Sequence, residues 1–174
     1  MNRPTALVTG ASSGIGLDLS RVLAKNGYDL VLVARTASKL QDAANELQKS
    51  GVSAGVIASD LSRPSAAAEI VAELTLRNIE IEVLVNNAGY GLTGPFVDND
   101  LQREVDMIQV NVVALTQLTK LLLRPMVARK RGRILNVAST AAFQPGPLMA
   151  VYYATKAYVL SFSEAIAEEL RDSG

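Results

Sequence analysis

Five short apolar runs alternate with longer helical patterns along the chain, and this alternation constrains the fold more than any other feature. The predicted strands are Thr5–Thr9, Asp29–Ala34, Val52–Ala58, Glu80–Asn86 and Arg133–Ala138. The predicted helices are Ile15–Asn26, Ala37–Ser50, Pro64–Arg77, Leu101–Arg129 and Val151–Asp172. Most of the strands are continuously apolar, which is typical of parallel strands covered on both faces. Strands that alternate with helices form βαβ units with right-handed crossovers, so the pattern predicts a doubly wound, parallel α/β sheet.

Length and composition exclude several other classes. The chain has 174 residues, which fits a single domain over residues 1–174, and 49% of them are hydrophobic. Its 17 basic and 17 acidic residues balance, so we expect no nucleic-acid partner. No run is long enough for a transmembrane helix, and the N-terminus does not read as a signal peptide. We therefore expect a cytoplasmic protein with no membrane partner.

Two residue types are missing, and their absence limits the possible chemistry. The sequence contains no Cys and no His. A disulfide framework, a zinc thiolate site and a thiol nucleophile are excluded, and so is the usual general base. We expect no metal site, and acid–base chemistry has to use Tyr, Lys, Asp or Glu.

A glycine-rich turn joins the first predicted strand to the first predicted helix. Gly10 permits the sharp turn, Gly14 lets the backbone approach a pyrophosphate, and Gly16 lets the helix pack close to the sheet. The helix N-terminus offers free N–H groups and a partial positive charge to phosphates. The residues assigned to this candidate dinucleotide site are Gly10, Ser12, Ser13, Gly14, Ile15 and Gly16. The alternative is a strand–helix turn that binds no ligand.

The residue after the second strand bears on the choice of cofactor. Proteins of this type that select NAD usually have a carboxylate there for the ribose 2′-hydroxyl. This chain has Ala34 and then Arg35, whose guanidinium is suited to a 2′-phosphate. The position therefore favours NADP(H) over NAD(H). The alternative is a solvated surface arginine.

A tyrosine and a lysine lie four residues apart at the start of the last predicted helix. Residues at this spacing share one helix face, so Tyr152 and Lys156 can point into one site. A nearby ammonium favours the phenolate form of tyrosine, which makes the phenol a better proton shuttle at neutral pH. The alternative is an amphipathic helix with a buried tyrosine and a surface lysine.

Further polar residues follow the other strands or interrupt an apolar helix. Ser139 follows the fifth strand, Asn87 and Gly89 the fourth, and Asp60 the third. Each alone could be ordinary turn chemistry. Asn111 lies among apolar residues of the long helix, where its amide needs partners. The alternative for Asn111 is an amide satisfied by a neighbouring backbone group.

Taken together, these residues resemble the short-chain dehydrogenase/reductase family in its compact form, with a Rossmann-like fold. The resemblance rests on Thr9-Gly10-x-x-x-Gly14-x-Gly16, Asp60, Asn86-Asn87-Ala88-Gly89, Asn111, Ser139 and Tyr152-x-x-x-Lys156. It implies an oxidoreductase that transfers a hydride between NADP(H) and a carbonyl or secondary alcohol. The implied catalytic residues are Asn111, Ser139, Tyr152 and Lys156. The implied cofactor contacts, besides the glycine turn and Arg35, are Asp60, Leu61, Asn87, Ala88, Gly89, Tyr152 and Lys156.

The resemblance also implies a role for each catalytic residue. Tyr152 would be the general acid in carbonyl reduction and the base in alcohol oxidation. Ser139 would hydrogen-bond the substrate oxygen, and Lys156 would hold the nicotinamide ribose and favour the Tyr152 phenolate. Asn111 would hold a water that links Lys156 to solvent. Asp60 would accept from the adenine amino group.

The end of the chain departs from the family pattern. The family continues with a sixth strand, a substrate-covering segment and a seventh strand, and this sequence contains none of them. We expect the sheet order 3-2-1-4-5 and interpret the chain as truncated. Phe143, Met149 and Val151 would line an apolar pocket for a lipophilic substrate. The resemblance also implies a homodimer or homotetramer. The rival hypothesis is an inactive nucleotide-binding or sensor protein with the same fold.

Overall fold

Five parallel strands form one sheet in the computed structural model, which describes residues 3–174. The strands are β1 (Thr5–Thr9), β2 (Asp29–Ala34), β3 (Ala54–Ala58), β4 (Val83–Asn86) and β5 (Arg133–Asn136). Their order is β3-β2-β1-β4-β5, which confirms the predicted doubly wound topology. The central strand β1 pairs on both sides, with Leu7 opposite Val31 of β2 and Leu84 of β4.

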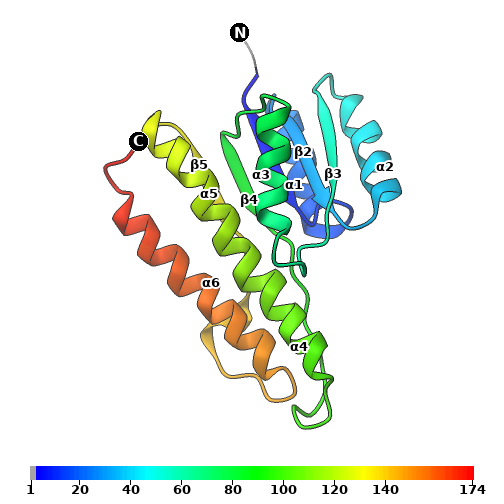
Figure 1. The fold of residues 1–174 in the computed structure, drawn as a ribbon, viewed down its shortest axis with the longest axis vertical. Helices are drawn as coiled ribbons and strands as arrows, with labels where there is room; N and C mark the ends of the chain where they lie inside the picture. Colours follow the sequence, from blue (N-terminus) through cyan, green and yellow to red (C-terminus); the bar gives the residue numbers. More distant parts are fainter. Residues whose placement is uncertain (1–2) are drawn as a thin grey trace.

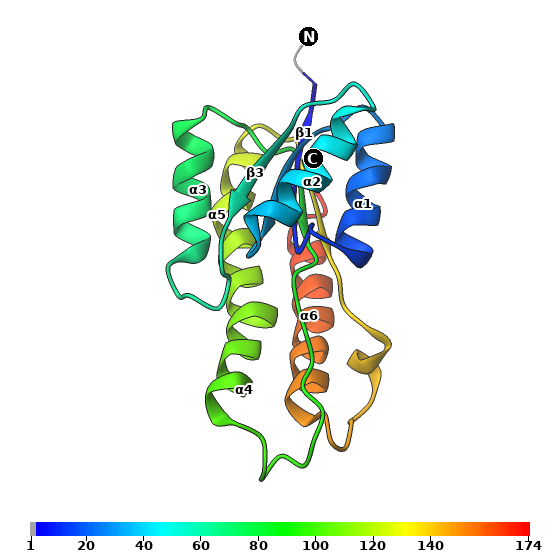
Figure 2. The same ribbon diagram turned by 90° about the vertical axis from the view of Figure 1, so that its right-hand side faces the viewer.

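Helices cover both faces of this sheet (Figures 1 and 2). They are α1 (Gly14–Lys25), α2 (Ala37–Gln48), α3 (Ala66–Leu76), α4 (Leu101–Ile108), α5 (Leu115–Ala128) and α6 (Ala150–Glu169). Alternate side chains of β1 explain the two layers, because successive residues of a strand point to opposite faces. Val8 packs in the cluster that contains Leu40 of α2, whereas Leu7 packs in the cluster that contains Ile70 of α3 and Leu118 of α5.

The long helix predicted over Leu101–Arg129 is interrupted. A π-helical turn, Gln109–Ala114, separates α4 from α5, although the three segments follow one another without a break. The sequence analysis predicted one continuous helix here and missed this turn, in which Asn111 and Ala114 are buried. A π turn inserts an extra residue into the helical repeat and often occurs at functional sites. It carries Asn111 here.

Several other predicted boundaries differ by a few residues. The strands β3, β4 and β5 are shorter than predicted, because only residues opposite a neighbouring strand join the ladder. Pro64 precedes α3 instead of lying inside it, in a turn closed by the Ala66 N–H and the Arg63 carbonyl. The helix α6 ends at Glu169 rather than Asp172.

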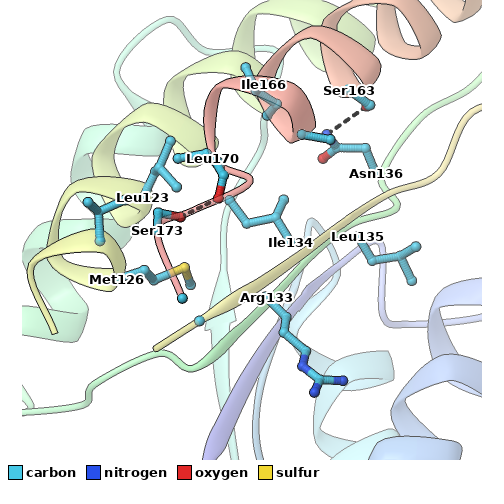
Figure 3. A pocket seen from close by; sticks show the side chains of 14 residues that line it. Leu123, Met126, Arg133, Ile134, Leu135, Asn136, Ser163, Ile166, Leu170 and Ser173 are labelled. Carbon is cyan, nitrogen blue, oxygen red and sulfur yellow. Dashed lines mark hydrogen bonds between the residues drawn. The ribbon is translucent and has the colours of Figure 1, made fainter. Parts of the chain in front are cut away.

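The strand β5 is an edge of the sheet and borders a hollow. Figure 3 shows this hollow between β5, α5 and α6, and its volume is about 450 Å³. Leu123 and Met126 line it from α5, Ile166 from α6, and Leu170 from the residue directly after α6. Within residues 3–174, β5 pairs only with β4. The side of the molecule beyond β5 is therefore less covered than the core around β1.

Gly16 makes possible the close approach of α1 to the carboxyl end of β1. A Cβ at this position would lie 2.3 Å from the Gly10 carbonyl oxygen and 2.5 Å from Asn87 Nδ2. We predict that Gly16→Ala lowers the free energy of unfolding by about 1–3 kcal/mol, because a backbone atom has to move.

Urea unfolding of Gly16→Ala and of a matched control measures this effect. Gly55→Ala in β3 is the control, since a Cβ there would meet its nearest atoms at 3.8 and 3.9 Å. The control should stay within about 0.5 kcal/mol of the parent. Equal losses in the two variants would contradict the steric explanation.

Candidate active site

The carboxyl ends of β1 and β4 are joined by a set of hydrogen bonds around Thr9. Its hydroxyl oxygen accepts the backbone N–H groups of Asn87 and Ala88, each at 3.0 Å. The Asn87 side chain returns the contact, because Nδ2 donates to the Thr9 carbonyl at 3.0 Å. The backbone N–H and the side-chain Nδ2 of Asn87 therefore both donate to the protein. Its side-chain Oδ1 has no hydrogen-bond partner within residues 3–174 and is available to a ligand.

The N-terminus of α1 opens directly onto this junction. Gly10 and Gly14 have positive φ angles of 67° and 54°, as the predicted turn requires. The N-cap Ser13 makes no side-chain cap hydrogen bond, and the first turn carries no acidic residue. Ile15 is 64% exposed. The free N–H groups of this helix end are thus available to an anion.

Asp60 and Arg35 lie at the ends of β3 and β2. Asp60 Oδ1 accepts the Ser62 backbone N–H at 3.0 Å and the Ser62 hydroxyl at 2.9 Å. The pKa of Asp60 lies below its usual value, first because of the Ser62 backbone N–H and further because of the charge of Arg35 nearby. Leu61 is buried in the core. Arg35 itself is exposed and makes no salt bridge within residues 3–174.

Tyr152 and Lys156 share one face of the first turns of α6. The Lys156 ammonium nitrogen lies 5.9 Å from the centre of the Tyr152 ring. The loop after β4 packs against both: a Cβ at Gly89 would lie 3.6 Å from Lys156 Nζ, and a Cβ at Gly91 would lie 3.1 Å from the Tyr152 ring. The end of β4 and the start of α6 are therefore in contact, and the spacing prediction for this pair is consistent with the geometry.

Lys156 is a buried lysine, so the alternative of a surface lysine is wrong. The residue is only 6% exposed, and its Nζ donates to the Val137 carbonyl at 2.8 Å. Burial lowers the pKa of Lys156. The ammonium lies beside the chain that leads from β5 to Ser139, two residues beyond Val137.

Ser139 caps the short 3₁₀ helix Thr140–Phe143. Its Oγ accepts the Ala141 backbone N–H at 3.1 Å. A serine hydroxyl also has one hydrogen to donate. Ser139 is half-buried, and within residues 3–174 that hydrogen has no acceptor, so the hydroxyl is able to donate to a substrate oxygen.

Asn111 uses its whole side chain inside the protein. Oδ1 accepts the Tyr90 N–H at 3.1 Å, and Nδ2 donates to the Tyr90 carbonyl at 2.9 Å and to the Thr155 hydroxyl at 3.1 Å. The alternative of an amide satisfied by a nearby backbone group therefore describes part of what Asn111 does. A water at this position could be held only by the second lone pair of Oδ1 or by the backbone, because both amide hydrogens are taken.

Three contributors to this arrangement were missed by sequence reasoning. They are the Tyr90 backbone, the Val137 carbonyl and the Thr155 hydroxyl. Thr155 stands directly before Lys156, and its position in a helix beside the Tyr–Lys pair was the only available signal. The backbone contributors have no residue-type signal at all.

No three acidic side chains in residues 3–174 come together as a metal site. No helix there is long and apolar enough to cross a bilayer. The hollow beside β5 contains none of the predicted site residues.

This combination of a doubly wound sheet, a glycine-rich helix N-terminus and a Tyr–Lys pair defines a Rossmann-like α/β protein of the dinucleotide-binding type. Comparison with known sequences identifies the group more narrowly. The chain belongs to the short-chain dehydrogenase family, which it matches over residues 4–174.

Individual relatives agree with that assignment. The chain is 41% identical over 169 residues to a very-long-chain 3-oxoacyl-CoA reductase of Laccaria bicolor, covering 95% of this chain and 50% of that protein. It superimposes on the short-chain dehydrogenase from Sphingobium yanoikuyae in complex with NADPH with a TM-score of 0.91, at 40% identity, covering 98% of this chain and 67% of that one. It also resembles the bulky-bulky ketone specific alcohol dehydrogenase from Comamonas testosteroni, with a TM-score of 0.93, 36% identity and coverage of 100% and 70%. The chain spans about half the length of the curated relatives it matches.

The buried ammonium leads to a prediction about pH. Because the pKa of Lys156 is lowered in the folded state, the unfolded chain binds more protons below the usual lysine value of 10.5. The free energy of unfolding attributable to Lys156 therefore rises with pH in that window, as the cost of burying the charge is removed. We predict that Lys156→Met stabilises the ligand-free chain near neutral pH and loses this alkaline gain.

Chemical denaturation of the parent and of Lys156→Met at several pH values between about 7 and 10 measures the difference. Lys120→Met, at an exposed position of α5, is the matched control. The control should leave the pH dependence unchanged. Parallel curves for the parent and Lys156→Met would contradict the prediction.

Proposed function

We propose that the protein is an NADP(H)-dependent oxidoreductase that interconverts a carbonyl group and a secondary alcohol. The observation that carries the proposal is the convergence of the Tyr152–Lys156 pair with the loop after β4 at the end where α1 begins. A proton donor and a candidate dinucleotide site thus lie at the same edge of the sheet.

The residues at that edge fit a dinucleotide. The α1 N-terminus has an uncapped Ser13 and no acidic first-turn residue, so it suits a pyrophosphate. Asp60 uses Oδ1 for Ser62, which leaves Oδ2 to accept from an adenine amino group. Its lowered pKa keeps the acceptor charged at neutral pH.

The preference for NADP(H) rests on Arg35. Its exposed guanidinium follows β2 without a salt-bridge partner in residues 3–174, so it is available to a 2′-phosphate. The similarity to a short-chain dehydrogenase described in complex with NADPH supports the same choice.

The proposed chemistry uses three side chains, those of Ser139, Tyr152 and Lys156. When bound, the nicotinamide supplies or accepts the hydride. In the reducing direction Ser139 donates its free hydroxyl hydrogen to the substrate oxygen and stabilises the charge that develops there. Tyr152 donates its phenolic proton to the same oxygen, and the Lys156 ammonium stabilises the phenolate that remains. The oxidising direction reverses these transfers.

The substrate we propose is lipophilic. Phe143 and Leu148 are exposed on the segment that leads into α6, and Phe96 is exposed on the loop before α4. The two segments are joined, because the Gly94 N–H donates to the Leu148 carbonyl at 2.8 Å. Met149 lies against the Gly91 position and Tyr152. Such a border suits an apolar ketone or acyl group. The names of two relatives, a very-long-chain 3-oxoacyl-CoA reductase and a bulky-bulky ketone specific alcohol dehydrogenase, support the same choice.

Association into a dimer or tetramer and a cytoplasmic location stay predictions.

Replacement of Tyr152 tests the proposed reaction. Tyr152→Phe removes the proton donor and should lower kcat/KM for a bulky apolar ketone about 10²–10⁴-fold, the range for general acid catalysis. NADPH oxidation followed by absorbance measures it. Tyr153→Phe is the matched control, because the Tyr153 ring packs on Gly146 instead. Unchanged turnover in Tyr152→Phe would contradict the role of Tyr152 as proton donor, whereas a parent that binds NADPH without turnover would favour the inactive nucleotide-binding protein.

Replacement of Arg35 tests the cofactor preference separately. We expect Arg35→Ala to weaken NADPH binding about 10- to 100-fold, the loss typical of a hydrogen bond to a charged group, and to leave NADH binding unchanged. Arg63→Ala is the control, since Arg63 is nearby but pairs with Glu69. Calorimetric titration of the parent and the two variants with NADPH and with NADH measures the affinities. Equal losses for both nucleotides in Arg35→Ala would refute the 2′-phosphate assignment.

A further inference from the structure

The hydroxyl of Thr155 joins Asn111 to the backbone of Tyr152. Asn111 Nδ2 donates to Thr155 Oγ1 at 3.1 Å, and Thr155 Oγ1 donates to the Tyr152 carbonyl at 2.7 Å. Asn111 is 1% exposed and Thr155 is 3% exposed, so water does not compete for these groups. The π-helical turn and the first turn of α6 are thereby held together by one side chain.

The direction of each hydrogen bond is determined by the partners. The Tyr90 N–H can only donate, so it orients Asn111 with Oδ1 toward Tyr90 and leaves Nδ2 to donate. The Tyr152 carbonyl can only accept, so the single hydroxyl hydrogen of Thr155 goes there. The Thr155 oxygen is therefore free to accept from Asn111, and each hydrogen bond in this series can run in only one direction.

Thr155 bonds differently from a hydroxyl that is used only within its own helix. Thr75 donates to the carbonyl four residues earlier, a local bond that any helix offers. Thr155 instead donates to the carbonyl three residues earlier and also accepts from another element. Rotation of α6 about its axis would break the second contact.

We infer that Thr155 is a positioning residue for the Tyr152–Lys156 pair, an inference that rests on the function proposed above. Tyr152 and Lys156 are oriented by the first turns of α6, and Thr155 lies between them. Small displacements of a reacting group cost large factors in rate, because proton transfer needs donor and acceptor within hydrogen-bond distance. Thr155 acts through Tyr152 and touches no substrate.

The same helix supplies a matched control. Asn136 Nδ2 donates to Ser163 Oγ at 2.9 Å, and Ser163 Oγ donates to the Val159 carbonyl at 2.6 Å, as Figure 3 shows for the first of these bonds. This second amide–hydroxyl–carbonyl connection ties α6 to β5 about two turns beyond Thr155. Ser163→Ala removes it without touching the Tyr152 turn.

Steady-state kinetics of four proteins test the inference. Thr155→Val should lower kcat for a bulky apolar ketone about 10- to 100-fold with the KM for NADPH unchanged. Thr155→Ser keeps the hydroxyl and should restore kcat to within about threefold of the parent. Ser163→Ala should lower the melting temperature and leave kcat near the parent value. Thr155→Ala is the second hydroxyl-free variant if Thr155→Val does not fold.

Hydrogen exchange of the ligand-free chain gives a readout that needs no turnover. Amides of residues 150–157 should exchange about tenfold faster in Thr155→Val than in the parent, while those of the second half of α6 change little. A parent without turnover would defeat the proposed function, and this selective increase in exchange would still support the positioning role of Thr155. Equal exchange in the two proteins, an equal loss of kcat in Ser163→Ala, or a failed rescue by Thr155→Ser would overturn the inference.

Discussion

The contact between the ends of β1 and β4 is the constraint on which the candidate site depends. Thr9 binds two backbone N–H groups beyond β4, and Asn87 binds the carbonyl of Thr9 in return. A Cβ at Gly10 or Gly16 would collide with this junction. The strands β1 and β4 thus end at a fixed separation, and α1 begins immediately beside them. The geometry that suits a pyrophosphate is a consequence of this packing.

The other half of the site depends on a buried charge. Lys156 places an ammonium group where burial disfavours it, and the Val137 carbonyl satisfies only one of its three N–H donors. A lysine whose charge is disfavoured by burial is more consistent with binding or catalysis than with packing. The remaining donors are the groups that could hold ribose hydroxyls, which agrees with the role implied by the family resemblance.

Sequence reasoning predicted the architecture better than the contacts. The continuous apolar runs predicted a parallel sheet because both faces are covered, and the glycines of the first turn predicted a sharp turn there, where Gly10 and Gly14 have positive φ angles. The π turn was not predicted, because no residue type marks the place where a helix changes to π geometry. The partners of Asn111 could not be predicted either. They lie 21 and 44 residues away and include backbone groups, which have no residue-type signal.

The way α6 is buried explains why its polar contacts carry so much weight. Its buried residues are Thr155, Lys156 and Val159, whereas α5 buries Leu115, Leu118, Thr119, Leu122 and Met126. Apolar packing is non-directional and tolerates small rotations of a helix. Hydrogen bonds lose strength steeply when their angles change. In α5 the apolar face determines the placement of the helix. In α6 two amide–hydroxyl connections and one buried ammonium do so, and of these the connection through Thr155 lies at the turn that carries the residues proposed to move a proton.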